Sequence, residues 1–254
     1  MVNPSVSEQP KASASEDGER GLTNSSTSVT EMIRDDIIKG VWAPRQKLGV
    51  KEVADRYGVG VIPVREALAR LSTSGFVDFE DRRGFWVTAI SLSALMDVTE
   101  TRVFIETEAL RRSILAGDIA WEETLLSTHH RMRRTPIYLE DKITLNSAWE
   151  IAHTAYHTAL ISGCQSNWLI KLAMTLREQT ERYRNLSFTQ TSEETGKTVA
   201  IKRNIGGEHA DLLNAVLNKE VELACNLLAS HIRQTSALSA ERLRGNPHIT
   251  AKSC

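Results

Sequence analysis

Cysteine is scarce in this sequence, and its spacing matches no disulfide or metal motif. The chain of 254 residues contains three cysteines, at 164, 225 and 254, and none belongs to a C-x-x-C pair. An odd count without such spacing argues against a disulfide scaffold and fits a reducing compartment. We therefore expect a cytoplasmic protein.

Long apolar runs and a net charge are also missing. No apolar run approaches the roughly 18 residues of a membrane-spanning helix, and no hydrophobic segment opens the chain, so we expect neither a signal peptide nor a membrane span. The 31 basic residues nearly cancel the 32 acidic ones, and residues 24–90 hold ten basic against nine acidic residues. Any DNA-binding role must therefore rest on local placement of charge.

The length favours two domains, of roughly 70 and 150 residues. Residues 1–23 are rich in Ser, Glu, Pro and Gly and lack aromatics, which predicts a disordered tail. We expect a first domain over 24–90, a second over 91–243 and a flexible tail over 244–254.

The stretch from Tyr57 to Val87 carries the most specific local pattern. After a Gly-containing turn at 58–60, apolar residues recur at i, i+3, i+4 and i+7, which predicts an amphipathic helix that ends at the Ser-Gly pair 74–75. Two short runs rich in β-branched and aromatic residues then flank a turn at 80–84. A helix followed by such a hairpin predicts a winged helix-turn-helix, whose helix enters a DNA major groove.

Two upstream helices and a strand are expected to complete this unit. Possible N-caps at 26–28 precede an amphipathic segment that stops at Gly40. Residues 47–48 are predicted to form a short strand, and residues 51–57 a helix that supports the recognition helix.

Beyond residue 89 the pattern is almost entirely helical. Six helices are predicted, over 91–115, 118–134, 143–162, 166–186, 199–217 and 219–243. The second is expected to fray in the basic cluster at 129–134. The fold class predicted is mostly α, with an N-terminal winged helix-turn-helix followed by an all-α antiparallel helical bundle.

Three segments carry motifs of a known family: IIKGVWAPRQKL at 37–48, PVREAL at 63–68 and G-F-x-V at 84–87. Over about 65 residues they resemble the GntR family of bacterial transcription regulators. The order of a winged helix and an all-helical domain resembles the FadR-like subgroup with its FCD effector domain. Spaced residues such as Arg102-x-x-x-Glu106 support this second resemblance. It implies a DNA-binding regulator rather than an enzyme.

The resemblance also implies which residues contact DNA. Arg65 is the retained contact of the recognition helix, and Lys51 stands where the family often has an arginine that touches DNA. Arg83 and Gly84 are expected at the wing tip. Arg70 lies on the outward face of the recognition helix and joins the candidate set.

The turn before the recognition helix departs from the family's common G-V-S-R-T-P. Gly60 and Val61 replace a hydroxyl and a guanidinium that reach phosphate and guanine, so the operator is expected to differ. Ile62 is expected to meet a thymine methyl. The alternative is that Val61 and Ile62 mark weaker DNA binding. Arg45 stands at the family's turn glycine, which leaves the shape of that turn open.

Four histidines form a second candidate site. His153 and His157 stand at i and i+4 of one predicted helix, and His209 and His231 lie on the apolar stripes of two later helices. All four are therefore expected to face the bundle interior, where one divalent cation would satisfy them together. The alternative is four separate core histidines, each hydrogen-bonded to backbone or carboxylate groups.

The family pattern joins a D-x-x-x-H helix to two later histidines, and His153 takes the place of the aspartate here. An all-nitrogen set favours imidazole-preferring metals over Mg²⁺ or Ca²⁺, with zinc first and nickel as the alternative. A catalytic metal is not expected, because residues 153–157 lack the glutamate of H-E-x-x-H. Glu208 is also a poor base, since neighbours on a helix point about 100° apart.

In the family this metal helps to bind an effector, whose carboxylate can coordinate it. Arg102 is the residue expected to clamp that carboxylate through two parallel hydrogen bonds. The alternative is an i,i+4 pair with Glu106 on the helix surface. Tyr183 and Arg184 are weaker effector-binding candidates, which a solvated helix face explains nearly as well.

Together these observations predict a homodimeric, metal-containing repressor that binds a palindromic operator in double-stranded DNA. A small organic acid is expected to release it or modulate its binding. Two alternatives remain: a metabolite-sensing protein with weak, non-specific DNA binding, and a metal-dependent hydrolase.

Overall fold

The computed structural model describes residues 28–141, 145–194 and 203–244. The described residues form two compact units. The winged-helix unit runs up to Asp36 and resumes over Arg45–Thr88, while the helical unit takes Ile37–Pro44 and the residues from Ala89 onward. The tails predicted over 1–23 and 244–254 lie outside the described residues, except for Arg244.

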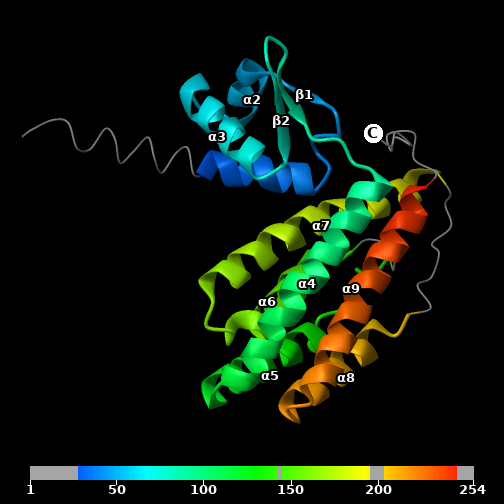
Figure 1. Cartoon of the computed structure of the whole chain (residues 1–254). Helices are drawn as coiled ribbons and strands as arrows, with labels where there is room; N and C mark the ends of the chain where they lie inside the picture. The colour runs from blue at the N-terminus through cyan, green and yellow to red at the C-terminus, as the bar shows by residue number, and fades with distance from the viewer. Residues whose placement is uncertain (1–27, 142–144, 195–202, 245–254) are drawn as a thin grey trace, which may run out of the picture. The chain divides into compact units, whose positions relative to one another are not determined.

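The winged-helix unit contains three helices and a small sheet (Figure 1). A helix over residues 28–38 precedes the other elements, which are β1 (Lys47–Leu48), α2 (Val50–Tyr57), α3 (Val61–Thr73), β2 (Val77–Glu80) and β3 (Gly84–Val87). All strand pairs are antiparallel, and β3 lies between β1 and β2. The predicted helix and hairpin are therefore α3 with β2 and β3.

Local chemistry explains the bounds of α3. Its buried side chains include the four apolar residues of the predicted stripe: Val64, Ala67, Leu68 and Leu71. The helix ends at Ser74, and Gly75 takes a φ of 78° that favours glycine. Arg45, at the family's turn glycine, takes the left-handed conformation itself, with a φ of 65°. The turn thus keeps a glycine-like backbone although its residue is arginine.

The helical unit consists of α4 (Leu92–Ala116), α5 (Ile119–Arg134), α6 (Ser147–Ser162), α7 (Asn167–Glu194), α8 (Ile205–Leu217) and α9 (Val221–Leu243). Side chains cap four of these helices at their N-termini: Ser91, Asp118, Asn146 and Asn204. Because Asn146 caps α6, that helix begins four residues later than predicted. Asn204 likewise starts α8 later than expected, and residues 199–202 of the prediction lie outside the described residues.

Two predictions about helix ends were wrong. Helix α5 ends at Arg134 as expected, but it does not fray in its basic cluster. Cationic side chains in the last turn favour this, because they interact well with the helix dipole. Helix α7 continues to Glu194, beyond the expected end at Leu186.

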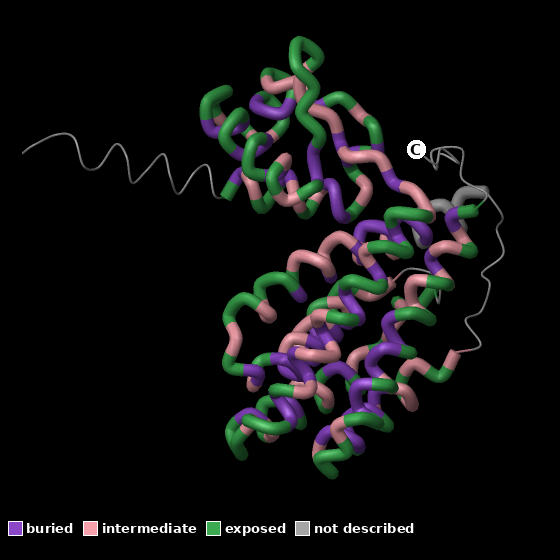
Figure 2. Tube along the Cα trace, in the orientation of Figure 1, coloured by how far each residue is buried: buried purple, intermediate pink, exposed green. Residues whose placement is uncertain are grey.

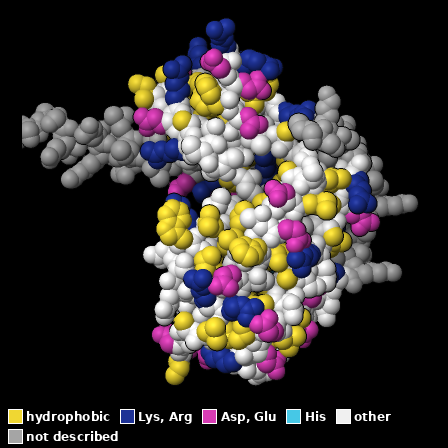
Figure 3. All heavy atoms as spheres, in the orientation of Figure 1, with side chains coloured by type: hydrophobic (Ala, Val, Ile, Leu, Met, Phe, Trp, Pro, Cys, Tyr) yellow, Lys and Arg dark blue, Asp and Glu magenta, His cyan; other side chains and the backbone are white. Residues whose placement is uncertain are grey.

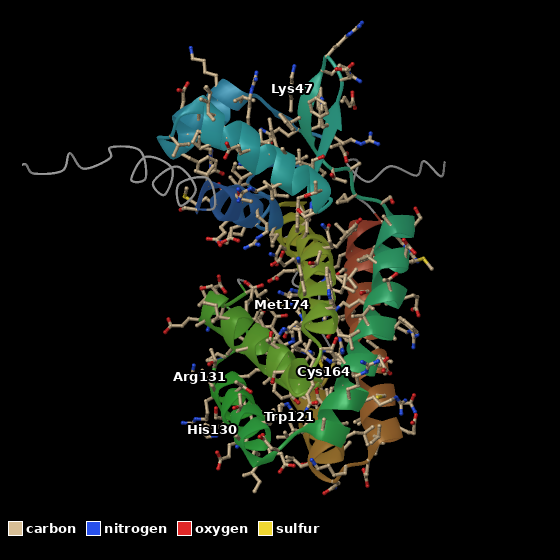
Figure 4. The ribbon with its side chains drawn as sticks, turned by 60° about the vertical axis from the view of Figure 1, so that its left-hand side comes forward. Lys47, Trp121, His130, Arg131, Cys164 and Met174 are labelled. Carbon is tan, nitrogen blue, oxygen red and sulfur yellow. The ribbon has the colours of Figure 1, made fainter. Side chains whose placement is uncertain are left out.

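The helices pack around a large hydrophobic core and a smaller cluster that contains Leu95, Leu186 and Leu243. Helix α4 contacts both α7 and α9, and α5 packs against α6 (Figure 1). Buried positions recur on the inward sides of these helices (Figure 2). Trp121 of α5 lies in this core and donates a hydrogen bond from Nε1 to the Ala159 carbonyl at 2.8 Å, and Cys164 belongs to the same core (Figure 4). No helix among the described residues is long and apolar enough to cross a membrane.

Candidate functional site

The four predicted histidines converge inside the helical unit. His153 and His157 come from α6, His209 from α8 and His231 from α9. One potential ligand atom from each lies within 4.8 Å of those of the other three. All four are at most 9% exposed, and no histidine reaches the surface on the face drawn in Figure 3. The structure therefore brings together residues up to 78 positions apart in the sequence.

The chemistry of this cluster fits a divalent cation. Both ring nitrogens of His157 and Nε2 of His209 are buried and have no hydrogen-bond partner among the described residues. Burial lowers the pKa of all four imidazoles, that of His209 to about 2, so the rings are neutral and keep a lone pair for a metal. The alternative of four core histidines, each with its own hydrogen-bond partners, does not fit this arrangement.

Glu208 orients one member of the cluster. Its Oε2 accepts a hydrogen bond from His231 Nδ1 at 2.9 Å, and Arg203 donates from Nε to its Oε1 at 2.6 Å. Burial opposes ionisation, but these hydrogen bonds lower the pKa of Glu208 to about 2. Since a carboxylate only accepts hydrogen bonds, the contact with Glu208 requires a proton on His231 Nδ1, which would leave Nε2 for a cation. Arg203 Nη2, which can only donate, lies somewhat further from the same nitrogen, at 3.2 Å. This role of Glu208 was not predicted, because its partner lies 23 positions away in the sequence.

A buried ion-pair cluster lies beside the histidines. Glu106 is fully buried and accepts hydrogen bonds from Arg102 Nε at 2.5 Å and from Arg177 Nη2 at 3.0 Å. Burial alone would raise the pKa of Glu106, but the charges of the two guanidinium groups hold it below its usual value. Two cations thus share this one buried carboxylate. Arg177 was not predicted, because its i,i+3 and i,i+4 neighbours give no sign of a partner in α4.

The two expectations for Arg102 are both modified. The pair with Glu106 exists, but it is buried rather than on the helix surface. Arg102 also donates from Nη1 to Thr180 Oγ1 at 2.9 Å, and its Nη2 has no partner among the described residues. The expected clamp of two parallel hydrogen bonds therefore requires breaking one of these contacts, whereas a single bond from Nη2 does not.

A cavity with two lobes borders the histidines. Counting space that is open to solvent, the apolar lobe has a volume of about 570 Å³ and the polar lobe of about 500 Å³. Both are lined by His153, Arg184, His231, Thr235 and Ser239. Arg102 lines the polar lobe. Tyr183 lines neither lobe, since it packs in a hydrophobic cluster with Ile90, Leu95, Leu186 and Leu243.

Arg184 lines both lobes but already has anionic partners. Its Nη2 donates to Glu150 Oε1 and to Glu181 Oε1, each at 2.9 Å. The side chain is therefore positioned by ion pairs rather than solvated on a helix face.

The residues predicted to contact DNA lie on the surface of the winged-helix unit. Seven of them are exposed, and Gly84 is half-buried: the exposed set is Lys51, Gly60, Val61, Ile62, Arg65, Arg70 and Arg83. Ile62 is 66% exposed, which is unusual for a large apolar side chain at the start of a helix. Arg65 lies one turn further along α3 and forms no ion pair within the described part of the chain. Gly60 is the N-cap of α3 and supplies no side-chain hydrogen bond.

Arg82 lies beside the residues predicted at the wing tip. Arg83 donates to Glu80 Oε2 at 2.5 Å and lies 5.4 Å from the Trp86 ring centroid, so its side chain is already engaged. Arg82 occupies the turn itself with a φ of 61°, is exposed, and has no side-chain partner among the described residues. Lys47 lies beside the same hairpin, 5.7 Å from Trp86 (Figure 4). Sequence reasoning passed over Arg82, although the pair of adjacent arginines was visible.

Comparisons with known proteins point to one class. Residues 25–87 match the family described as bacterial regulatory proteins, gntR family, and residues 97–234 match the FCD domain. The HTH-type transcriptional regulator BphR of Paraburkholderia xenovorans (strain LB400), described as uncharacterized, is 35% identical over 85% of this chain and 84% of that protein. The HTH-type transcriptional repressor GlaR of Escherichia coli (strain K12) is 27% identical over 89% of this chain and all of its own length.

The fold has a counterpart among solved structures. E. coli McbR/YncC matches 87% of this chain and 99% of its own, with a TM-score of 0.67 at 18% identity. This likeness confirms the predicted fold class. The matched families and relatives are transcriptional regulators, which confirms that no enzyme should be expected and removes the hydrolase alternative.

Proposed function

Because the chain belongs to the GntR family of bacterial regulatory proteins and carries an FCD domain, we propose that it is an effector-responsive, metal-containing repressor. It acts in the cytoplasm as a homodimer on a palindromic operator. Residues 24–90 bind double-stranded DNA, and residues 91–243 bind the metal and a small carboxylate effector.

The convergence of four neutral imidazoles beside a cavity carries this proposal. A divalent cation held by uncharged ligands alone keeps both of its positive charges, unlike one that an aspartate also binds. Arg102, which shares Glu106 with Arg177, lines the pocket beside it. A cation that keeps both charges favours an anion as a further ligand, and a carboxylate suits both the metal and the Arg102 guanidinium.

This chain's own residues would bind and orient the effector. The metal would be held by the four histidines His153, His157, His209 and His231. We expect zinc, with nickel as the alternative, and the ion would supply a positive charge for a carboxylate oxygen. Arg102 donates one hydrogen bond from Nη2, while its other contacts keep the side chain in place. A ligand that binds one dimer arrangement better than the other would then change DNA affinity.

Exposed apolar side chains on α4 support the dimer. Met96, Phe104 and Leu115 are 69 to 72% exposed, and their positions fall within about 100° of the helix circumference. Hydrophobic side chains interspersed with charged groups are visible on the surface drawn in Figure 3. An apolar strip of this kind is usual for a protein interface. Two recognition helices about one DNA turn apart require such a dimer.

A gel shift with the upstream region of the chain's own gene tests the regulator. We expect sequence-specific retardation at moderate salt, and at least tenfold weaker binding by Arg65→Ala, since one good arginine contact to a base contributes about 1 to 3 kcal/mol. Arg131→Ala is the matched control, because Arg131 lies on α5, far along the chain from α3, and is exposed (Figure 4). Equal loss in both variants, or no specific shift with the parent protein, contradicts the proposal.

The exposed Val61 and Ile62 favour a second candidate, a metabolite-sensing protein that binds DNA weakly and without sequence preference. In that case unrelated DNA would compete as well as the upstream region does in the same gel shift.

A further inference from the structure

The apolar lobe of the cavity has a wall of hydrophobic and aromatic side chains. Six residues from the segment after α5 and from α6, α8 and α9 form it: Ile137, Tyr138, Leu145, Trp149, Ile205 and Leu238. Trp149 stacks on His153 with ring centroids 4.6 Å apart and an interplanar angle of 24°. The metal-binding cluster therefore borders an aromatic surface on this side.

All three cations of the apolar lobe already have hydrogen-bond partners. Arg184 pairs with Glu150 and Glu181, and Arg203 donates to Glu208 and to Thr235 Oγ1 at 2.8 Å. The third, Arg242, is hydrogen-bonded to Tyr138. An effector carboxylate placed in this lobe would lose water and would have to compete with these contacts for a cation, which is costly.

The polar lobe has the opposite character. Arg102 and Arg177 line it and share the carboxylate of Glu106, while Glu181 and Arg184, which also line it, pair with each other. Thr154, Thr180 and Ser236 add hydroxyl groups. His153 and His231 line both lobes, so the histidine cluster lies where the two lobes meet.

From this division we infer that the effector is an amphipathic monocarboxylate, with an aromatic or branched apolar body. Its carboxylate lies at the junction, beside the histidine cluster and Arg102, and its body fills the apolar lobe against Trp149 and Leu238. Small hydroxy acids are too small to cover this apolar wall, and polycarboxylates would place a charge against it. The inference rests on the proposed function, because it requires a carboxylate to bind at the histidine cluster.

Calorimetric titration of the zinc-loaded full chain tests the inference with three probes: acetate, phenylacetate and citrate. Each methylene-sized increment of buried apolar body should tighten binding about fourfold. Phenylacetate is therefore expected to bind at least 100-fold more tightly than acetate, and more tightly than citrate.

Two variants locate the apolar body. Leu238→Asn and Leu145→Asn replace half-buried side chains of the lobe with polar ones of similar size. Each should weaken phenylacetate at least tenfold and leave acetate within about twofold, since acetate does not reach the wall. If a variant still binds acetate, it is folded. Two variants are used so that the test still holds if one of them misfolds. Ile151→Asn on the exposed side of α6 is the control and should change neither affinity.

The outcomes separate this inference from the proposed function. Citrate binding as tightly as phenylacetate, or equal losses for acetate and phenylacetate in the lobe variants, overturns the inference and leaves the carboxylate site intact. Failure of all three acids to bind the zinc-loaded chain overturns both.

Discussion

The two units of this chain use arginine in opposite ways. In the winged-helix unit Arg65 and Arg82 are exposed and have no side-chain partner among the described residues. In the helical unit Arg102 and Arg177 are buried and bonded to Glu106. An exposed cation can meet phosphate at little local cost, whereas a buried one needs an internal anion. Exposed arginines in one unit thus suit a polyanion, and buried ones in the other suit one small anion.

The largest effect is expected in the helical unit, where the small anion is proposed to bind beside a metal, when one buried imidazole is removed. His157→Ala should lose most of the bound metal, from about one ion per chain, because three ligands and a gap hold it far less well. Elemental analysis after extensive dialysis measures this. His130→Ala is the control, since His130 is exposed on the outer side of α5 (Figure 4). Unchanged metal content in His157→Ala would remove the four-imidazole site.

Removing the buried anion should cause a large loss of stability. Glu106→Gln leaves two buried guanidinium groups without their charge partner, and we expect the free energy of unfolding to fall by about 3 to 5 kcal/mol. Urea denaturation of the metal-free protein measures the loss. Glu108→Gln breaks partly exposed pairs with Arg111 and Arg112 and should cost less than about 1 kcal/mol. Equal losses would mean that burial does not distinguish the two glutamates.

A smaller effect is expected from the group that orients His231. Glu208→Gln keeps the shape of the side chain but removes its charge, and metal affinity should weaken about 10- to 100-fold. Competition with a coloured chelator measures it. Asp211→Asn removes a charge from an exposed position of the same helix and should leave metal affinity unchanged. The same affinity in parent and Glu208→Gln proteins would contradict the positioning role.

The smallest predicted effect lies in the winged-helix unit. Gly60→Ser restores a capping hydroxyl at the start of α3, where the nearest atom to a new Cβ is Pro63 Cδ at 3.7 Å. Stability should rise by a few tenths of a kcal/mol. Gly58→Ser, two residues earlier, should instead destabilise by about 1 kcal/mol, because its φ of 66° is left-handed. Thermal unfolding of both variants checks the sign, and a shift in the same direction would refute this account of the turn.

Much of the fold followed from local patterns. The apolar stripe of α3 and the starts of α4 and α5 were predictable because each depends on residues within one or two turns. The inward direction of the four histidines followed from the apolar stripes of their own helices. The fraying of α5 and the end of α7 near 186 were predicted wrongly, because a helix continues where its charges and packing favour it, even where its apolar pattern weakens.

The pairing of buried polar groups was not predictable in this way. Arg177 meets Glu106 across 71 positions, and Glu208 meets His231 across 23. Tyr183 and Arg102 were both predicted to bind the effector, yet of the two only Arg102 lines the cavity. The periodicity of a helix predicts the direction in which a side chain points, but it does not predict which helix lies opposite.

The family, the order of a winged helix and a helical bundle, and the inward direction of the four imidazoles could be predicted from the amino-acid pattern, because periodicity and short motifs record contacts that are local. The packing of the helices was needed to establish that those imidazoles meet at one point, that Glu106 binds two arginines, and that the adjoining cavity has one charged and one apolar side. These features depend on how separate helices pack, and no spacing along the chain encodes that distance.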